Sequence, residues 1–212
     1  MDASHPISSV IPTLAAPVLE VLAGTTRGLS GREVHRLARA GSVRGVQLVL
    51  ARLVSHGLVR ADEHSTATLY TANRDHLAWP AIEALVGLRA QFLERLREAV
   101  GAWLIAPLHV SLVGSAARRD GSAESDIDLL IVRPDAVTEG DEAWEAQIGA
   151  LRDRVFSWTG NRCQAFDIDR ARLGGHVAAR DPLVENWLRD GVLLAGRPLR
   201  SLIDSLALEV QA

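Results

Sequence analysis

Hydrophobic residues in the first third of the chain recur every three or four positions in three short runs, within residues 14–22, 34–38 and 43–53. This is the spacing of one face of an α-helix. Ser30 and Ser42 precede the second and third runs, and a glycine follows each of the three. Serine before a helix and glycine after it are typical end signals. The pattern therefore predicts three short helices before residue 58.

A β-hairpin is predicted next. Residues 58–60 are followed by a polar turn at residues 62–65 and by residues 66–71, which are rich in β-branched side chains. Three short helices and a hairpin are the outline of a winged helix-turn-helix, and residues 43–70 resemble the recognition helix and wing of bacterial regulators with this fold. The resemblance implies that the third helix enters the major groove of double-stranded DNA.

The charge distribution agrees with a DNA-binding surface in this region. The 212 residues include 23 basic side chains, all arginine, and 26 acidic ones, for a net charge of −3. Residues 27–60 nevertheless contain seven arginines and one acid, whereas residues 80–212 contain fifteen arginines and twenty acids. Because arginine attracts phosphate, we expect Arg44, Gln47 and Arg52 of the third helix to contact DNA. The alternative is a helical packing module that binds protein.

Trp79-Pro80 marks the predicted end of this first domain. Hydrophobic residues then repeat at helical spacing from residue 82 to residue 100, which predicts a helix of about five turns. This helix either joins two domains or belongs to the core of the second. The predicted organisation is a flexible tail at residues 1–12, a winged helix-turn-helix domain at 13–79, a connecting helix at 80–106 and a second domain at 107–212.

Strands and helices alternate in the second domain. Apolar runs predict strands at residues 108–113, 126–132 and 163–168. Helical spacing between residues 144 and 158 predicts a helix after the second strand. Asp181-Pro182 and Pro198 have the residue types that open two further helices. Interleaved strands and helices indicate an α/β or α+β domain.

The most informative motif lies between the first two of these strands. Gly114-Ser115 follows the first strand, and Asp126 and Asp128 open the second. Side chains alternate along a strand, so the two carboxylates share a face. Neighbouring carboxylates repel each other unless a cation lies between them, and oxygen ligands suit divalent cations. Backbone N–H groups in a glycine turn can bind phosphate at close range. The motif therefore predicts phosphoryl or nucleotidyl transfer.

These residues resemble the signature of the polymerase-β-like nucleotidyltransferase superfamily, most closely its minimal nucleotidyltransferase branch. The matching positions are Gly114-Ser115, Arg118 and Ser125-Asp126-x-Asp128-Leu129. The resemblance implies a mixed sheet flanked by helices, with a nucleoside triphosphate whose phosphates lie at Gly114 and Ser115. It also implies two Mg²⁺ ions, replaceable by Mn²⁺, bound to Asp126 and Asp128. An acceptor hydroxyl would attack the α-phosphorus and release pyrophosphate.

Two positions of the motif leave alternatives open. Arg118 lies where the family often has an arginine that binds phosphate, but a solvated arginine on a helix face explains it equally well. Arg119 departs from the family, which often has glycine there, and adds bulk beside the phosphate turn.

The family also has a third carboxylate on a later strand. Asp167 fits, because residues 166–168 have the apolar–Asp–apolar pattern and strand alternation places Asp167 beside the small residues Cys163 and Ala165. Asp167 would then be a metal ligand and the residue best placed to accept the proton of the acceptor. A different register would instead put Gln164 in the third position. Gln164 is neutral and binds metal poorly, so the site would be impaired or inactive.

Three hypotheses of function follow. The first is a Mg²⁺-dependent nucleotidyltransferase that transfers a nucleoside monophosphate to a hydroxyl of an unidentified acceptor and also binds DNA. The second is a DNA-binding transcriptional regulator whose nucleotidyltransferase-like domain senses nucleotide or holds a partner without turnover. The third is a protein of a toxin–antitoxin-like pair that acts beside a protein partner. A homodimer is expected by analogy with winged-helix regulators.

A cytoplasmic location is expected. Cys163 is the only cysteine, which excludes an intrachain disulfide. Residues 1–12 lack the basic start and apolar core of a signal peptide. The sequence contains no apolar run near the roughly 18 residues that span a membrane, so no membrane partner is expected.

Overall fold

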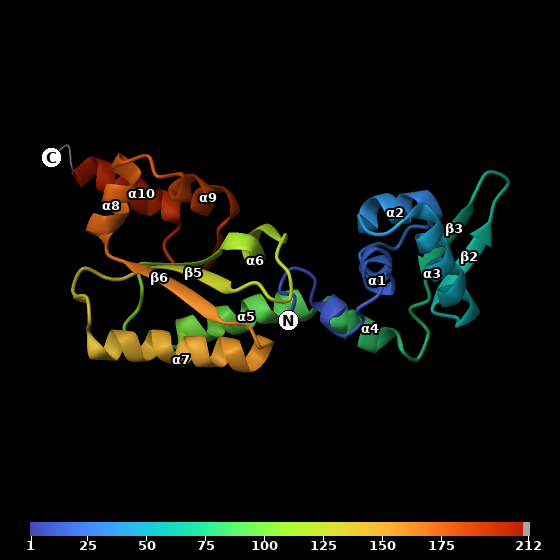
Figure 1. Cartoon of the computed structure of the whole chain (residues 1–212), viewed down its shortest axis with the longest axis horizontal. Helices are drawn as coiled ribbons and strands as arrows, with labels where there is room; N and C mark the ends of the chain where they lie inside the picture. Colours follow the sequence, from blue (N-terminus) through green and yellow to red (C-terminus); the bar gives the residue numbers. More distant parts are fainter. Residues whose placement is uncertain (210–212) are drawn as a thin grey trace. The chain divides into compact units, whose positions relative to one another are not determined.

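Residues 1–209 are described by the computed structural model of the chain, and they divide into two units (Figure 1). The N-terminal unit is His5–Arg89, and the C-terminal unit comprises Met1–Ser4 and the chain from Ala90 onward. The predicted domain boundary at residue 80 lies inside the N-terminal unit. Residues 1–4 pack with the C-terminal unit, although they precede the N-terminal one in the sequence.

The three helices predicted in the N-terminal unit are present, and the second and third begin at the predicted serine caps. They are α1 (Ala15–Ala23), α2 (Gly31–Ala38) and α3 (Val43–Ser55). Before α2, the Ser30 hydroxyl accepts a hydrogen bond from the Glu33 N–H, and the Glu33 carboxylate accepts one from the Ser30 N–H. Before α3, the Ser42 hydroxyl accepts from the Gly45 N–H. These bonds satisfy N–H groups that lack partners within the helix.

The predicted hairpin is present in a small antiparallel sheet. Its strands are β2 (Val59–Glu63) and β3 (Thr68–Ala72), and Ala61 pairs with Tyr70. The short strand β1 (Leu29–Ser30) pairs with the other edge of β3, which gives the order β1-β3-β2. The strand β1 was not expected, because two residues are too few to show a sequence pattern.

The segment expected to be a flexible tail contains packed residues. Pro6–Ser9 form a 3₁₀ helix, η1, and the Ile7 side chain is fully buried among residues of α1 and α3 and of α4 (Trp79–Val86). Ala3 and Ser4 are buried in the C-terminal unit. Residues 1–12 were expected to be a flexible tail, but their apolar and small side chains are buried in the cores of the two units.

The long helix predicted from residue 82 to residue 100 is two helices, α4 and α5 (Leu88–Gly101). Gly87 separates them, and its N–H donates to the backbone oxygens of Glu83 and Leu85. Glycine is a poor helix former, which explains a break at this position. Ile82 of α4 is buried in the N-terminal unit, whereas Leu96 of α5 is buried in the C-terminal unit.

A four-stranded mixed sheet forms the centre of the C-terminal unit. Its strands are β4 (His109–Val113), β5 (Ile127–Val132), β6 (Cys163–Ile168) and β7 (Val192–Gly196), in the order β6-β5-β4-β7. The strands β5 and β6 are parallel, and β4 is antiparallel to both β5 and β7. The first three strands agree with the sequence prediction, and β7 was not predicted.

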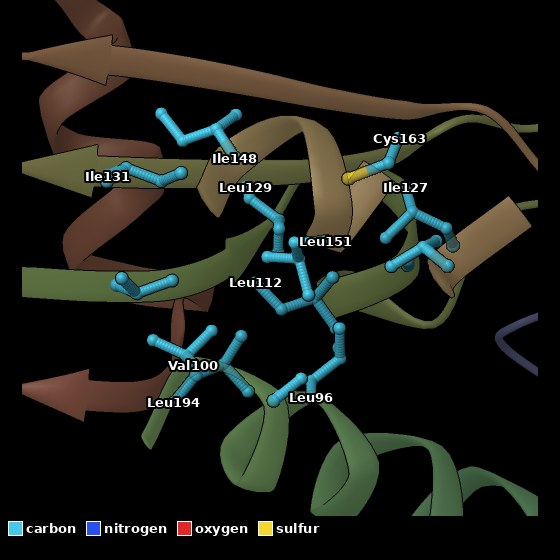
Figure 2. Close-up of a cluster of buried hydrophobic side chains, with 14 of the residues drawn as sticks. Leu96, Val100, Leu112, Ile127, Leu129, Ile131, Ile148, Leu151, Cys163 and Leu194 are labelled. Atoms are coloured by element: carbon cyan, nitrogen blue, oxygen red, sulfur yellow. The ribbon is translucent and has the colours of Figure 1, made fainter. Parts of the chain in front are cut away.

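Helices cover both faces of this sheet (Figure 1). On one face lie α5 and α7 (Glu142–Thr159), and their apolar side chains pack on alternate residues of the strands (Figure 2). Leu112, Leu129 and Ile131 point into this cluster together with Leu96 and Leu151. The other face is covered by α8 (Arg170–Ala178), α9 (Pro182–Asp190) and α10 (Leu199–Glu209). A mixed sheet flanked by helices is the arrangement that the family resemblance implies.

No helix within residues 1–209 combines the length and the apolar character needed to cross a membrane.

Candidate functional site

The Gly114 turn brings the backbone against a carboxylate. The short helix α6 (Gly114–Arg118) begins directly after β4, and Gly114 has a φ of +67°. A Cβ atom at this position would collide with the carboxylate of Asp128. Only glycine combines this backbone conformation with the required space. Position 114 of the motif therefore requires glycine, because the turn lies so close to Asp128.

The two motif aspartates lie together at the start of β5. Asp128 pairs with Val113 on β4 and with Gln164 on β6, and Asp126 immediately precedes the strand. Burial raises the pKa of the Asp128 carboxyl above its ordinary value of 3.8, and the charge of Asp126 raises it further, while Arg118 opposes the rise. Among the described residues, no hydrogen bond or ion pair involves the carboxylate of Asp128. The charge is thus poorly compensated within the chain.

Asp167 does not belong to this group, which corrects the sequence-based assignment. In the parallel pairing of β5 with β6, Asp128 lies opposite Gln164, whereas Asp167 lies opposite Ile131. Ile131 faces α5 and α7, so Asp167 lies on the other side of the sheet from Asp128. The predicted role of Asp167 as a third metal ligand and proton acceptor fails for this geometric reason.

The surroundings of Asp167 are those of a structural ion pair. Arg133 Nη1 donates to Asp167 Oδ2 at 2.7 Å, and the indole Nε1 of Trp144 donates to the same oxygen at 3.2 Å. Arg133 Nη2 also donates to Asp169 at 3.3 Å. Burial alone would lower the pKa of Arg133, but the hydrogen bond and the charge of Asp167 raise it above its ordinary value, with further contributions from Asp169 and Glu139.

Gln164 occupies the position that the third carboxylate was expected to fill. Its Nε2 lies 3.5 Å from Asp126 Oδ2, on the face that Asp128 shares. Two carboxylates and one amide oxygen, available after rotation of the amide, are oxygen donors of the kind that Mg²⁺ binds. Within residues 1–209, no group of three or more His, Cys, Asp or Glu side chains is arranged to hold a metal ion. The donor set suits a cation whose remaining ligands come from a bound phosphate.

A pocket of about 240 Å³ opens beside Asp128. It is bounded by β4, β5, β6, α6 and α9, and its polar lining comprises Arg118, Asp128, Asn186 and Asp190. Arg118 Nε donates to Asp120 at 2.9 Å, and this hydrogen bond raises the pKa of Arg118. Asp190 accepts from Arg189, which lowers the pKa of Asp190. Arg118 is thus an exposed cation at the edge of an acidic pocket.

Part of the lining of this pocket is apolar. Phe166 and Leu183 are exposed there, and the Phe166 ring lies 5.5 Å from the ring of Trp187, centroid to centroid. Sequence reasoning missed these residues because Phe166 and Trp187 belong to hydrophobic patterns that also describe a core. Flat apolar side chains beside a charged group suit the base and sugar of a nucleotide.

Two residues remote in sequence hold the loop before Asp126. The N–H of Gly121 donates to the Ser4 hydroxyl at 3.1 Å. The buried side-chain amide of Asn161 donates to the backbone oxygens of Ala123 and Ser125, at 3.0 and 2.9 Å. The predicted phosphate ligand Ser115 faces this loop, since a Cβ at Gly121 would lie 3.0 Å from the Ser115 hydroxyl. Neither Ser4 nor Asn161 has a local sequence signal for this role.

Comparisons with known proteins give weak similarities. No family model matches the chain, and no curated relative was found for it. Among solved structures, the chain is similar to a mutant of the toxin–antitoxin MntA–HpeT, with 12% identity and a TM-score of 0.38 over 56% of this chain and 86% of the other. It is also similar to a toxin–antitoxin solved with AMP-PNP, with 14% identity and a TM-score of 0.36 over the same shares. Similarities this weak define neither the fold nor the activity of the present chain.

A second candidate site lies on α3 in the N-terminal unit. The predicted DNA contacts Arg44, Gln47 and Arg52 are exposed, and their spacing puts them on one face of the helix. Leu48, which the pattern places in the core, is 64% exposed on this same face. Val46, Leu50 and Leu53 are the buried side chains of α3 instead. The exposed face of α3 is therefore polar and basic, with one large apolar side chain near its centre.

The arginines around this face are free of acidic partners. Among the side chains that the structure describes, no ion pair involves Arg32, Arg36, Arg39, Arg44 or Arg52, whereas Arg27 pairs with Glu33 and Arg60 with Asp75. A polar pocket of about 480 Å³ lies between the start of α2, Gln47 of α3 and the β2–β3 hairpin, with Arg32, Thr66 and Thr68 in its lining. Uncompensated arginines beside hydroxyl groups suit phosphate.

Proposed function

We propose that the C-terminal unit is a Mg²⁺-dependent nucleotidyltransferase whose nucleoside triphosphate binds in the pocket beside Asp128. The main support is the uncompensated carboxylate pair at the Gly114 turn. Burial and the neighbouring charge of Asp126 raise the pKa of Asp128, so the two carboxylates favour a divalent cation between them. The proposed reaction transfers a nucleoside monophosphate to a hydroxyl of an acceptor and releases pyrophosphate.

The residues of the pocket have distinct roles in this proposal. Asp126 and Asp128 would hold the cation, which when bound neutralises negative charge on the phosphate oxygens. Gly114 leaves space for a phosphate beside the turn, and Ser115 supplies a hydroxyl there. Arg118 would exchange its exposed partner Asp120 for a phosphate oxygen, because a bidentate arginine–phosphate contact is stronger than an exposed ion pair.

The apolar wall would bind the nucleoside. Phe166 presents an exposed ring to the pocket, and Trp187 supports that ring from α9. A base stacked on Phe166 would cover apolar surface that is otherwise in contact with water. Asn186 and Asp190 also line the pocket and would offer polar atoms to the base edge or to the ribose.

Gln164 favours a second candidate function, in which nucleotide binds without turnover. An amide donates or accepts hydrogen bonds, but it does not accept the proton of an attacking hydroxyl. The pocket therefore lacks the third carboxylate at the position opposite Asp128. In this alternative the C-terminal unit senses nucleotide or holds a partner, and DNA binding by the N-terminal unit is the output.

We also propose that the N-terminal unit is a winged helix-turn-helix that binds double-stranded DNA. Its order of elements, α1, β1, α2, α3 and the β2–β3 hairpin, supports this assignment. The exposed Arg44, Gln47 and Arg52 on α3 and the exposed Arg32 and Arg36 on α2 support a DNA surface. The helix α3 would enter the major groove, and the hairpin would contact the neighbouring backbone.

The first test is calorimetric titration of a non-hydrolysable ATP analogue with and without Mg²⁺. The proteins are the wild type, the double variant Asp126→Asn/Asp128→Asn, and Asp135→Asn as a control at an exposed acid of the same unit. We expect Mg²⁺-dependent binding by the wild type and the control, and its loss in the double variant. Absence of binding by the wild type contradicts both the transferase and the nucleotide sensor, and leaves only the partner-holding role.

Turnover separates the two candidates. Pyrophosphate release from ATP, measured with hydroxyl-bearing small molecules, RNA and protein as acceptors, supports the transferase. Mg²⁺-dependent binding without release by any acceptor favours the sensor. For the N-terminal unit, Arg44→Ala should weaken binding to all duplexes and lower the slope of log affinity against log salt by about 1. A control at Arg97→Ala, in the C-terminal unit, should leave the slope unchanged.

A further inference from the structure

Leu48 is the least expected side chain on the exposed face of α3. It is 64% exposed, although leucine in a helix with a buried face is normally found on that face. Arg44 and Arg52 lie one turn before and one turn after it, and Ala51 lies beside it on the same face. The center of a basic helix face is therefore apolar over about one turn.

The charge around this apolar spot indicates what covers it. Arg44 and Arg52 on α3 and Arg32 and Arg36 on α2 are exposed and form no ion pair with any acidic side chain that the structure describes. Such a surface complements a polyanion and would repel a basic protein or a second copy of the same arginine-rich face. Double-stranded DNA is the occupant that offers negative charge at the edges and apolar groups at the centre, because the 5-methyl group of thymine projects into the major groove.

We infer that Leu48, with Ala51 beside it, contacts thymine methyl groups when α3 lies in the major groove. This inference rests on the proposed DNA binding by the N-terminal unit and adds the base that the helix prefers. Methyl groups of thymine are the only apolar groups on the base edges of that groove, and an aliphatic side chain discriminates them from cytosine and the purines. Arg44, Gln47 and Arg52 supply the polar contacts on either side.

Replacing thymine by uracil tests this inference, since uracil lacks only the methyl group. Duplexes with a random central segment are synthesised once with thymine and once with uracil, and the full chain selects from the thymine pool at low salt. The dissociation constants of the selected duplexes are then measured in both chemical forms. For the wild type we expect the uracil form to bind about fourfold more weakly for each methyl group that Leu48 covers.

Two variants test whether the preference for thymine over uracil depends on the Leu48 side chain. Leu48→Ala should bind both forms with nearly equal affinity and should remain folded, because the side chain is mostly exposed. Leu37→Ala is the matched control, since Leu37 is 48% exposed on α2. This control should retain the preference of the wild type.

The possible failures are distinguishable. Equal binding of the thymine and uracil forms by the wild type overturns the inference but leaves DNA binding intact. A preference that survives in Leu48→Ala also overturns it, because the methyl group is then recognised by another residue. Absence of binding to either pool at low salt contradicts the proposed DNA-binding function itself, and the inference with it.

Discussion

Asp128 and Asp167 lie on neighbouring strands of one sheet, but on opposite faces and in opposite electrostatic surroundings. Asp167 accepts hydrogen bonds from Arg133 and Trp144, and only 14% of its side chain is exposed. Asp128 is half-buried beside a second carboxylate, and its pKa is raised by burial and by Asp126. One charge is compensated inside the fold, and the other is not.

This difference separates a structural charge from a candidate functional one. A buried carboxylate with an arginine partner completes the packing of β5, β6 and α7 and requires no ligand. An uncompensated carboxylate pair at the edge of a pocket costs free energy until a cation or a proton neutralises it. Proximity in sequence to a plausible motif is therefore a weaker guide to function than the absence of an internal partner.

The largest expected effect comes from breaking the compensated pair. Arg133→Met should lower the free energy of unfolding of the C-terminal unit by about 3–5 kcal/mol, because the Asp167 carboxylate stays buried without its cation. Chemical denaturation followed by tryptophan fluorescence measures the change. Where the variant is folded, its Mg²⁺-dependent nucleotide affinity should equal that of the wild type, since the pair lies on the other face from Asp128.

The same substitution at an exposed pair is the control. Arg97 on α5 pairs with the exposed Glu94 at 3.3 Å, so Arg97→Met should change the stability by less than about 0.5 kcal/mol. A neutral or stabilising result for Arg133→Met would show that Asp167 does not depend on this partner. Loss of nucleotide affinity in a folded Arg133→Met protein would show that Asp167 contributes to nucleotide binding.

A smaller effect is expected at the loop that leads to the uncompensated pair. Asn161→Ala removes the buried amide that donates to the Ala123 and Ser125 oxygens, and it should cost about 2 kcal/mol of stability. The loop before Asp126 would also lose an anchor, so Mg²⁺-dependent nucleotide binding should weaken. Thermal denaturation and calorimetry measure the two changes.

The variant Asn161→Asp tests the same two hydrogen bonds without removing side-chain volume. It keeps the size of the side chain but removes both donated hydrogen bonds. Unchanged nucleotide affinity in both variants, despite the lower stability, would mean that this loop does not position Asp126.

A substitution at Gln164 should increase the uncompensated negative charge on the face of the sheet that carries Asp128. Gln164→Asp places a third carboxylate beside Asp126 and Asp128, so at neutral pH and without divalent cations it should destabilise the fold by about 1 kcal/mol. Added Mg²⁺ should reverse this loss and raise the melting temperature more than in the wild type, and pyrophosphate release should increase. Gln164→Asn, which adds no charge, should show neither effect. An unchanged response to Mg²⁺ would argue against a cation site at Asp126 and Asp128.

Elements with end signals of their own could be predicted from the sequence. The helix α3 begins after its cap Ser42, and α9 begins at Pro182, after its cap Asp181, and ends before Gly191. The Gly114 turn and the carboxylate pair that it touches were also predictable, because both lie within one short motif. In each case the information is local, and nearby residues supply the hydrogen bonds or the conformational freedom.

The face on which Asp167 lies could not be predicted in the same way. Strand alternation correctly places Asp167 with Cys163 and Ala165, but it does not say which face of β6 joins Asp128. That choice depends on the register with β5, and a shift of one residue inverts it. The anchors Ser4 and Asn161 were missed for a related reason, since each acts on a loop that is remote in the sequence.

The smallest expected effect is the change in stability caused by Asp128→Asn, and its sign shows whether the fold requires the Asp128 charge. Because the folded-state pKa of Asp128 is raised, its contribution favours the folded state at pH values below the ordinary value of 3.8 and is lost as the pH rises through the raised pKa. Without divalent cations, Asp128→Asn should therefore be more stable than the wild type at pH 7, by less than about 1 kcal/mol because the carboxylate is half exposed. The difference should disappear on acidification.

Mg²⁺ with the ATP analogue should make the wild type the more stable protein at pH 7, because only the wild type then gains stability from binding. Denaturation curves at several pH values, each with EDTA or with Mg²⁺ and nucleotide, measure all of these differences. A destabilised Asp128→Asn protein in EDTA would place Asp128, like Asp167, among the charges that the fold itself requires.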